Sequence, residues 1–293
     1  MKDYKLLFIF LLLFLVLTNC EDENNVSPNS EPETEKEEGS WLKYSTIDWT
    51  HDGFPISGTF CKVYSDGASN TLKLQCLEFA DEMFEEILIQ LNFENFSDLK
   101  LPPENDKINV YINTDHDENV ASAYWGTIFI TIRTSYLDTG RYKYLFKHEL
   151  THEFEFMIEG TVNLGTDVWF REAIAIYCGG GFNFINTVDD LEDWITANEN
   201  FPGQGNPIMI HVWEDFPEGS DITGYYCEAF DISMKYLLDP KGLNKSLQDV
   251  IQVFYDVRDG VSFNPAFQNN FGLSLKVFED EFYDRIKAYL TVL

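Results

Sequence analysis

Two histidines four residues apart, His148 and His152, constrain the fold of this chain more than any other sequence feature. They lie in the string HELTHEFEF, inside a stretch that predicts a helix over about 140–158. Residues four apart share one face of a helix, so both imidazoles point the same way. Glu149 follows His148 directly, so its carboxylate is expected at the edge of the helix face that carries both imidazoles.

A second predicted helix, over about 167–178, carries Glu172 twenty residues after His152. Two imidazoles and one carboxylate can hold Zn²⁺ and leave a fourth coordination position open for water. We therefore expect His148, His152 and Glu172 to bind zinc. Glu149 is then the general base, which takes a proton from the activated water without binding the metal.

The spacing of these two motifs resembles that of the gluzincins, the thermolysin-like branch of zinc peptidases. Their pattern is HExxH, nineteen further residues and a ligand Glu on the next helix, which here is Glu172 within WFREAIAIY. HELTHEFEF also resembles the motif of secreted peptidase-MA-like proteins, in which a Gly usually stands where this chain has Ala173. The resemblance implies a peptidase acting on peptides or proteins.

The same resemblance implies further parts of a site. In zincins an antiparallel edge strand hydrogen-bonds the substrate backbone, a role that residues 121–126 and 127–132 can fill; a plain core strand is the alternative. Thermolysin-like enzymes orient one zinc-bound His with an Asp, and Ile176 occupies that place here. The partner of His148 or His152 must therefore come from elsewhere.

The resemblance also implies a hydrogen-bond donor for the oxyanion that develops on the substrate carbonyl. In related enzymes this donor is a Tyr or His from the following subdomain. Tyr225 and Tyr226 open a predicted helix at about 223 and are the candidates, with His211 as the third. Packing in the core is the alternative for both tyrosines. No exopeptidase motif of the GxMEN type is present, so we expect an endopeptidase.

The order of elements predicts an α+β, zincin-like fold, with a mixed sheet, an antiparallel edge strand and the motif helix, followed by a mostly helical C-terminal subdomain. We predict the subdomains to span 41–178 and 179–293. Residues 127–132 are expected to form an edge strand, and residues 179–219 to be rich in loops. The other predicted elements are strands at 58–65 and 108–112, a helix capped by Asn70 or Thr71 that runs to about 91, and helices at 223–239, 244–257 and 274–291.

The N-terminus has the features of an export signal. The apolar run of 6–17 is shorter than the roughly 20 residues that span a bilayer, and it suits the core of a signal peptide. It ends in LTNC, which resembles the lipobox of bacterial lipoproteins and implies cleavage after residue 19 and a lipid on Cys20. An ordinary secretory signal is the alternative. Either reading places the protein outside the cytoplasm, and the first anchors it to the bacterial outer membrane.

Residues 21–40 are predicted to be a disordered acidic tether, because 21–38 hold eight acidic residues and no aromatic one. An acidic run after the lipidated Cys resembles the export tag of surface-exposed lipoproteins; a solvated spacer is the alternative. The whole chain has a formal net charge of −30 and no basic stripe, which excludes nucleic acid as a partner. We expect a monomer that meets the membrane only through its lipid.

Four cysteines remain after Cys20, and none forms a CxxC pair, which argues against a cysteine-based zinc site. In an oxidising compartment they allow two disulfides, and we favour Cys61–Cys76 and Cys178–Cys227. Free buried thiols are the alternative.

Two other interpretations of the whole chain stay open. One is a binding module that keeps zinc for stability and captures a glycan or protein; the intact Glu149 argues against it, since a structural zinc needs no base. The other is a structural lipoprotein in which the HExxH string is accidental.

Overall fold

The structure is a computed structural model, and it describes residues 54–93, 96, 99–114, 121–132, 140–161, 164–181, 185–197 and 223–293. The predicted signal, Cys20 and the acidic tether lie outside these residues. Among the described residues, no helix is both long and apolar enough to cross a bilayer.

Within the described residues, five strands form one mixed sheet in the order β1-β2-β3-β5-β4. Strands β2, β3 and β5 run parallel, whereas β1 and β4 lie antiparallel at the two edges. The confirmed α+β class therefore includes the antiparallel edge strand expected from the sequence. The strands are β1 (Ile56–Ser57), β2 (Cys61–Asp66), β3 (Ile108–Asn113), β4 (Ala121–Tyr124) and β5 (Thr127–Thr131).

The prediction of 127–132 as an edge strand is wrong. β5 pairs with β3 on one side and with β4 on the other, so it is an inner strand. Its buried residues, which include Ile128 and Ile130, alternate with partly exposed ones, and this period-2 pattern is the same for an edge strand and for an inner strand of a sheet with one open face. The true edge is β4, whose four residues were too few to stand out.

Two long helices cover one face of the sheet. α4 (Asn70–Gln90) packs on β2, and α5 (Gly140–Glu159) packs on β4 and on α4. The stripe that predicted α4 is largely buried, and its cap is Ser69 rather than Asn70 or Thr71, because the Ser69 hydroxyl accepts a hydrogen bond from the Leu72 amide.

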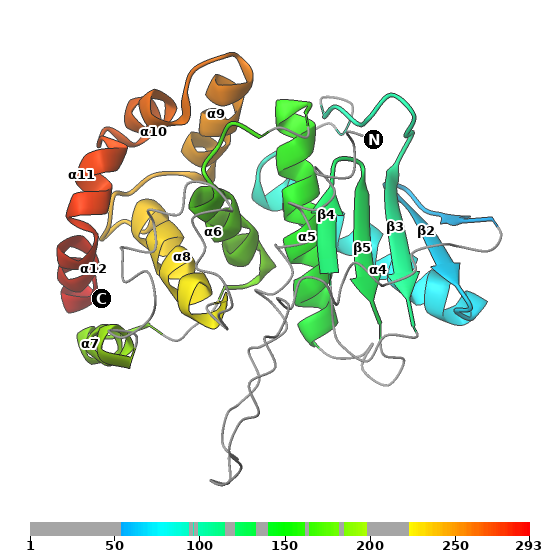
Figure 1. The fold of residues 1–293 in the computed structure, drawn as a ribbon, viewed down its shortest axis with the longest axis horizontal. Coiled ribbons are helices and arrows are strands. Elements are labelled where there is room, and N and C mark those ends of the chain that lie inside the picture. Colours follow the sequence, from blue (N-terminus) through cyan, green and yellow to red (C-terminus); the bar gives the residue numbers. More distant parts are fainter. Residues whose placement is uncertain are drawn as a thin grey trace, which may run out of the picture.

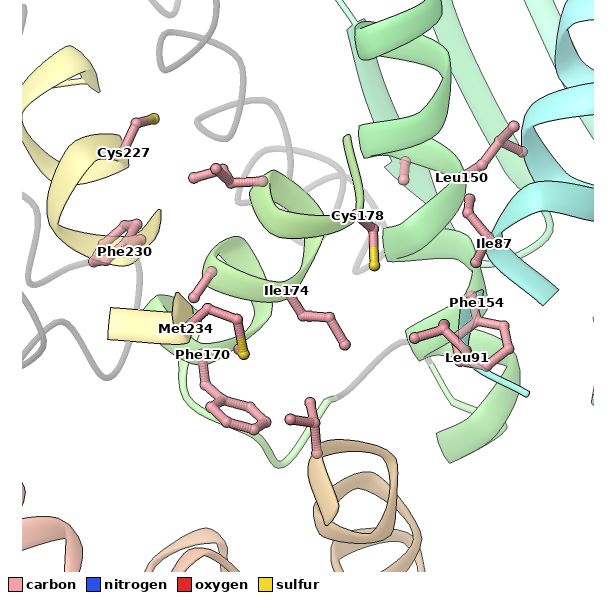
Figure 2. Packing of buried hydrophobic residues seen from close by; sticks show 14 of the residues in the cluster. Ile87, Leu91, Leu150, Phe154, Phe170, Ile174, Cys178, Cys227, Phe230 and Met234 are labelled. Atoms are coloured by element: carbon pink, nitrogen blue, oxygen red, sulfur yellow. The ribbon is translucent and has the colours of Figure 1, made fainter. Parts of the chain in front are cut away.

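Helices make up the rest of the described fold, on the side of α5 away from the sheet (Figure 1). α6 contacts both α5 and α8, and so joins the two parts. Figure 2 follows one continuous core from Ile87 of α4 through Leu150 of α5 and Ile174 of α6 to Met234 of α8. The helices are α6 (Val168–Gly179), α7 (Val188–Ala197), α8 (Thr223–Leu238), α9 (Leu247–Arg258), α10 (Phe263–Phe271), α11 (Leu275–Asp280) and α12 (Phe282–Val292).

Three helix predictions need correction. α7 lies in the region predicted to be loop-rich, and α10 was not predicted. The single helix expected over 274–291 is two helices, α11 and α12, with Glu281 between them. The apolar stripe continues across this break, because Phe278 and Phe282 are both buried, so the periodicity does not reveal it. The division into subdomains at residue 178 stays a prediction.

The favoured disulfides are also wrong. All four cysteines of the described residues are buried, and none of them forms a disulfide. Cys178 and Cys227 belong to α6 and α8, and Figure 2 shows their sulfur atoms turned into different parts of the core. Burial raises the pKa of the Cys76 and Cys178 thiols to about 12, which suits inert packing residues.

One prediction concerns Gly126, which closes the turn between β4 and β5. Its φ of +81° is unfavourable for other residues, and a Cβ there would lie 2.4 Å from Asn105 Nδ2. We expect Gly126→Ala to lower the free energy of unfolding by about 2–4 kcal/mol, because left-handed strain and overpacking add. Urea unfolding followed by tryptophan fluorescence measures it.

The matched control is Gly272→Ala, at a φ of +73° with no atom within 4 Å of the added Cβ. Only the backbone penalty of about 1 kcal/mol applies there. Equal losses for the two variants would contradict the steric account of Gly126.

Candidate metal centre

The α5–α6 hairpin brings the three predicted ligands together. His148 and His152 project from α5 toward α6, where Glu172 faces them, and all three side chains are buried. The Glu159 carboxylate closes the connection between the helices, because it accepts hydrogen bonds from the Gly165 amide and the Thr166 hydroxyl at 2.9 and 3.0 Å. This anchor precedes α6 directly and so helps to fix where Glu172 lies.

The geometry of the three side chains suits a tetrahedral metal. The Nε2 atoms of His148 and His152 are 3.1 Å apart, His148 Nε2 lies 3.6 Å from Oε2 of Glu172, and His152 Nε2 lies 3.3 Å from Oε1 of the same carboxylate. Ligands at the usual zinc distances of about 2.0–2.1 Å in a tetrahedron are ~3.3 Å from one another. The distance between the two Nε2 atoms is close to such an edge, and when each residue offers one ligand atom the three atoms lie within 4.8 Å of one another.

The unsatisfied polar atoms point to the same conclusion. Both carboxylate oxygens of Glu172 are buried and make no hydrogen bond of good geometry. Burial alone would favour its neutral form, yet His152 and His148 hold the pKa of Glu172 well below its usual range. An ionised carboxylate facing two imidazole nitrogens in a dry interior is a donor set that a divalent cation satisfies.

Glu155 is the carboxylate partner that the sequence did not reveal. Its Oε2 lies 3.1 Å from His152 Nδ1, and its side chain is completely buried. A bond at Nδ1 fixes the tautomer and turns Nε2 toward the other two ligands. Ile176 stands where thermolysin-like enzymes have the Asp that orients a zinc-bound His, and in this structure it is a core residue. The available signal was the spacing, since Glu155 follows His152 by three residues on the same helix.

Arg171, directly before Glu172, was also missed. Its side chain is buried, and its Nε has no hydrogen-bond partner among the described residues. Burial raises the pKa of Glu155, while the charges of His152 and Arg171 act in the opposite direction. Arg171 thus places a permanent positive charge beside the carboxylate that orients His152.

Glu149, the predicted base, is buried next to the ligand set and is not part of it. Burial raises its pKa to about 8, and its Oε2 makes no hydrogen bond in the described structure. A carboxylate that is desolvated and has an open acceptor position can receive a proton from a water at the centre.

The oxyanion donors proposed from the sequence stay predictions. Tyr226 is buried in α8, where its ring stacks on Phe230 with centroids 5.9 Å apart. Burial, with a smaller effect from Tyr283 of α12, raises the pKa of Tyr226 to about 12. The side chain of Tyr225 and the whole of His211 lie outside the described residues.

A scan against models of protein families finds no match to this chain, and a search of curated proteins finds no similar sequence. The case for a function therefore rests on the residues and their geometry.

Glu155 provides a test of the metal centre that does not need activity. Glu155→Gln keeps the shape but removes the charge that strengthens the bond to His152 Nδ1, so we expect zinc affinity to fall by about 10- to 100-fold. Competition against a fluorescent zinc chelator measures it. Asp81→Asn is the control, because Asp81 is also a helix carboxylate that accepts hydrogen bonds, but it belongs to α4 and bonds to the amides of Thr59, Phe60 and Cys61. An equal loss of affinity in both variants would mean that Glu155 has no special role.

Proposed function

We propose that this chain is a zinc-dependent peptidase of the gluzincin type. The observation that carries the proposal is the meeting of His148, His152 and Glu172 within one buried cluster, where one ligand atom from each residue lies within 4.8 Å of the other two. The HExxH motif, the spacing to Glu172 and the antiparallel edge strand beside the motif helix also support it.

The chemistry divides between the metal and the chain. Bound zinc supplies a Lewis acid that lowers the pKa of a water and polarises a carbonyl group. Glu149 accepts the proton that this water loses and later delivers it to the leaving amine. Glu155 keeps His152 in the tautomer that presents Nε2, and the surrounding core of α4, α5 and α6 excludes bulk water.

The edge strand supports a peptide as the substrate. β4 lies along α5, and its inward side chains are the small residues Ala121 and Ala123, which are both buried. An extended peptide that adds to the side of β4 on which no strand of the described structure pairs would run beside the helix that carries the base and two ligands. The binding module and the accidental motif remain the rival functions.

The decisive experiment compares Glu149→Gln with wild type. We expect the variant to bind zinc stoichiometrically and to lose about 10²- to 10⁴-fold in turnover, because only the proton acceptor is removed. Metal analysis and cleavage of a mixed octapeptide library, followed by mass spectrometry, provide the two measurements. Zinc without cleavage in either protein would favour the binding module, and absence of zinc would favour an accidental motif.

Zinc should also stabilise the fold. A ligand present at about 1,000 times its dissociation constant adds ~4 kcal/mol to the free energy of unfolding. We expect a chelator to lower the thermal midpoint of wild type and of Glu149→Gln, and to leave His148→Ala and His152→Ala unchanged, since these variants lack a ligand. A midpoint that does not respond to the chelator in wild type would contradict the metal centre.

A further inference from the structure

The edge of the described sheet that β4 forms ends in a turn that is bonded to the motif helix. β4 pairs with β5 through Tyr124 and Thr127, and Trp125 and Gly126 form the turn between them. The Gly126 amide donates a hydrogen bond of 2.6 Å to Glu153 Oε2 of α5, and the backbone of Thr127 also bonds to this carboxylate. One side chain of α5 therefore holds the start of β5 and, through the turn, the end of β4.

A second set of bonds fixes the same turn from the other side. The Gly126 carbonyl accepts from the Asn109 amide at 2.9 Å and from Asn105 Nδ2 at 3.0 Å. Trp125 Nε1 donates to the Lys100 carbonyl at 2.8 Å, and the Lys100 amide donates to the Met157 carbonyl at the end of α5. The turn thus has little freedom to move relative to α5.

The position of Glu153 along α5 links this anchor to the proposed chemistry. Glu153 directly follows the ligand His152 and lies one helical turn after Glu149, so it shares a helical face with the base. Bonds to the turn and to the metal thus come from successive residues of one rigid helix. A shift of the edge strand relative to the centre would require Glu153 to release its bonds.

Burying the carboxyl group of Glu153 is unfavourable in free energy. The side chain is fully buried, and its Oε1 has no hydrogen-bond partner among the described residues. A buried carboxyl group with one unsatisfied oxygen lowers the stability of a fold. Its presence here therefore calls for an explanation other than stability.

We propose that Glu153 is a positioning residue that sets the register of edge strand β4 against the metal centre, so that an extended peptide paired with β4 is held with one peptide bond at Glu149. This inference rests on the proposed peptidase function. It makes extended peptides of several residues the substrates that depend on Glu153, because a dipeptide at the centre does not reach along β4.

The other edge of the sheet offers a matched control. Asp81 of α4 accepts hydrogen bonds from the amides of Thr59, Phe60 and Cys61, in the connection between β1 and β2. It is the same kind of anchor, a helix carboxylate that holds a hairpin, at the edge formed by β1. Asp81→Ala should therefore destabilise the fold and leave peptide binding beside α5 unchanged.

The experiment uses zinc-loaded full chains with Glu153→Ala, Glu153→Gln or Asp81→Ala. In the wild-type background, apparent KM and kcat are measured for a mixed octapeptide library and a blocked dipeptide library. In the Glu149→Gln background, the dissociation constant of a fluorescent octapeptide library is measured. Hydrogen exchange of the β4–β5 turn reports whether the anchor has been released.

We expect Glu153→Ala to keep stoichiometric zinc, to speed exchange at Gly126 and to weaken octapeptide binding by about 10- to 100-fold. The change should appear in KM rather than kcat, and the dipeptides should show none. Glu153→Gln should recover most of the binding, since its amide oxygen can accept from Gly126.

Two results would overturn the inference. One is faster exchange at the turn in Glu153→Ala with octapeptide binding unchanged, and the other is an equal loss of binding in Asp81→Ala. A wild-type protein that binds octapeptides and never cleaves them would refute the peptidase function alone, because the binding comparison between the variants would still decide the role of Glu153.

Discussion

The desolvation of charged side chains on α5 is the constraint on which the rest of this structure depends. α5 is enclosed by the sheet, α4 and α6, and it carries buried glutamates at 149, 153, 155 and 159, while Glu172 faces it from α6. Among the described residues, Arg171 is the only buried lysine or arginine, so little permanent positive charge offsets this group. A low-dielectric interior does not tolerate such an excess of carboxylates without compensation. A divalent cation between His148, His152 and Glu172 would supply it.

The same helix organises the elements around it. Three of its buried carboxylates bond to different partners: Glu153 to the turn between β4 and β5, Glu155 to His152, and Glu159 to the segment before α6. The three glutamates lie within less than two turns of the helix. The positions of the edge strand, of one imidazole and of α6 are therefore all set from one rigid element, which is the precision that the proposed hydrolysis would require.

Packing of helices α9, α10 and α11 against the start of α6 stabilises this arrangement. Trp169 and Phe170, in the first turn of α6, pack among aromatic rings of α9, α10 and α11. The start of α6 is thus fixed in an aromatic core, and Glu172 follows it by less than one turn. Many of the phenylalanines of the chain lie here, and their large rigid rings pack tightly around the start of α6.

The sequence by itself determined the features that depend on residues close together along the chain. The helical positions of His148, Glu149 and His152, and the extents of α4, α5 and α6, follow from periodicity, because an α-helix is held by bonds between residues four apart. Only the tertiary structure decided that β5 is an inner strand, that Glu155 rather than a residue near Ile176 orients His152, that Glu153 bonds to the turn at the edge strand, and that the four described cysteines form no disulfide. These features depend on which elements pack against one another, and the side-chain pattern of a single element is the same for several such arrangements.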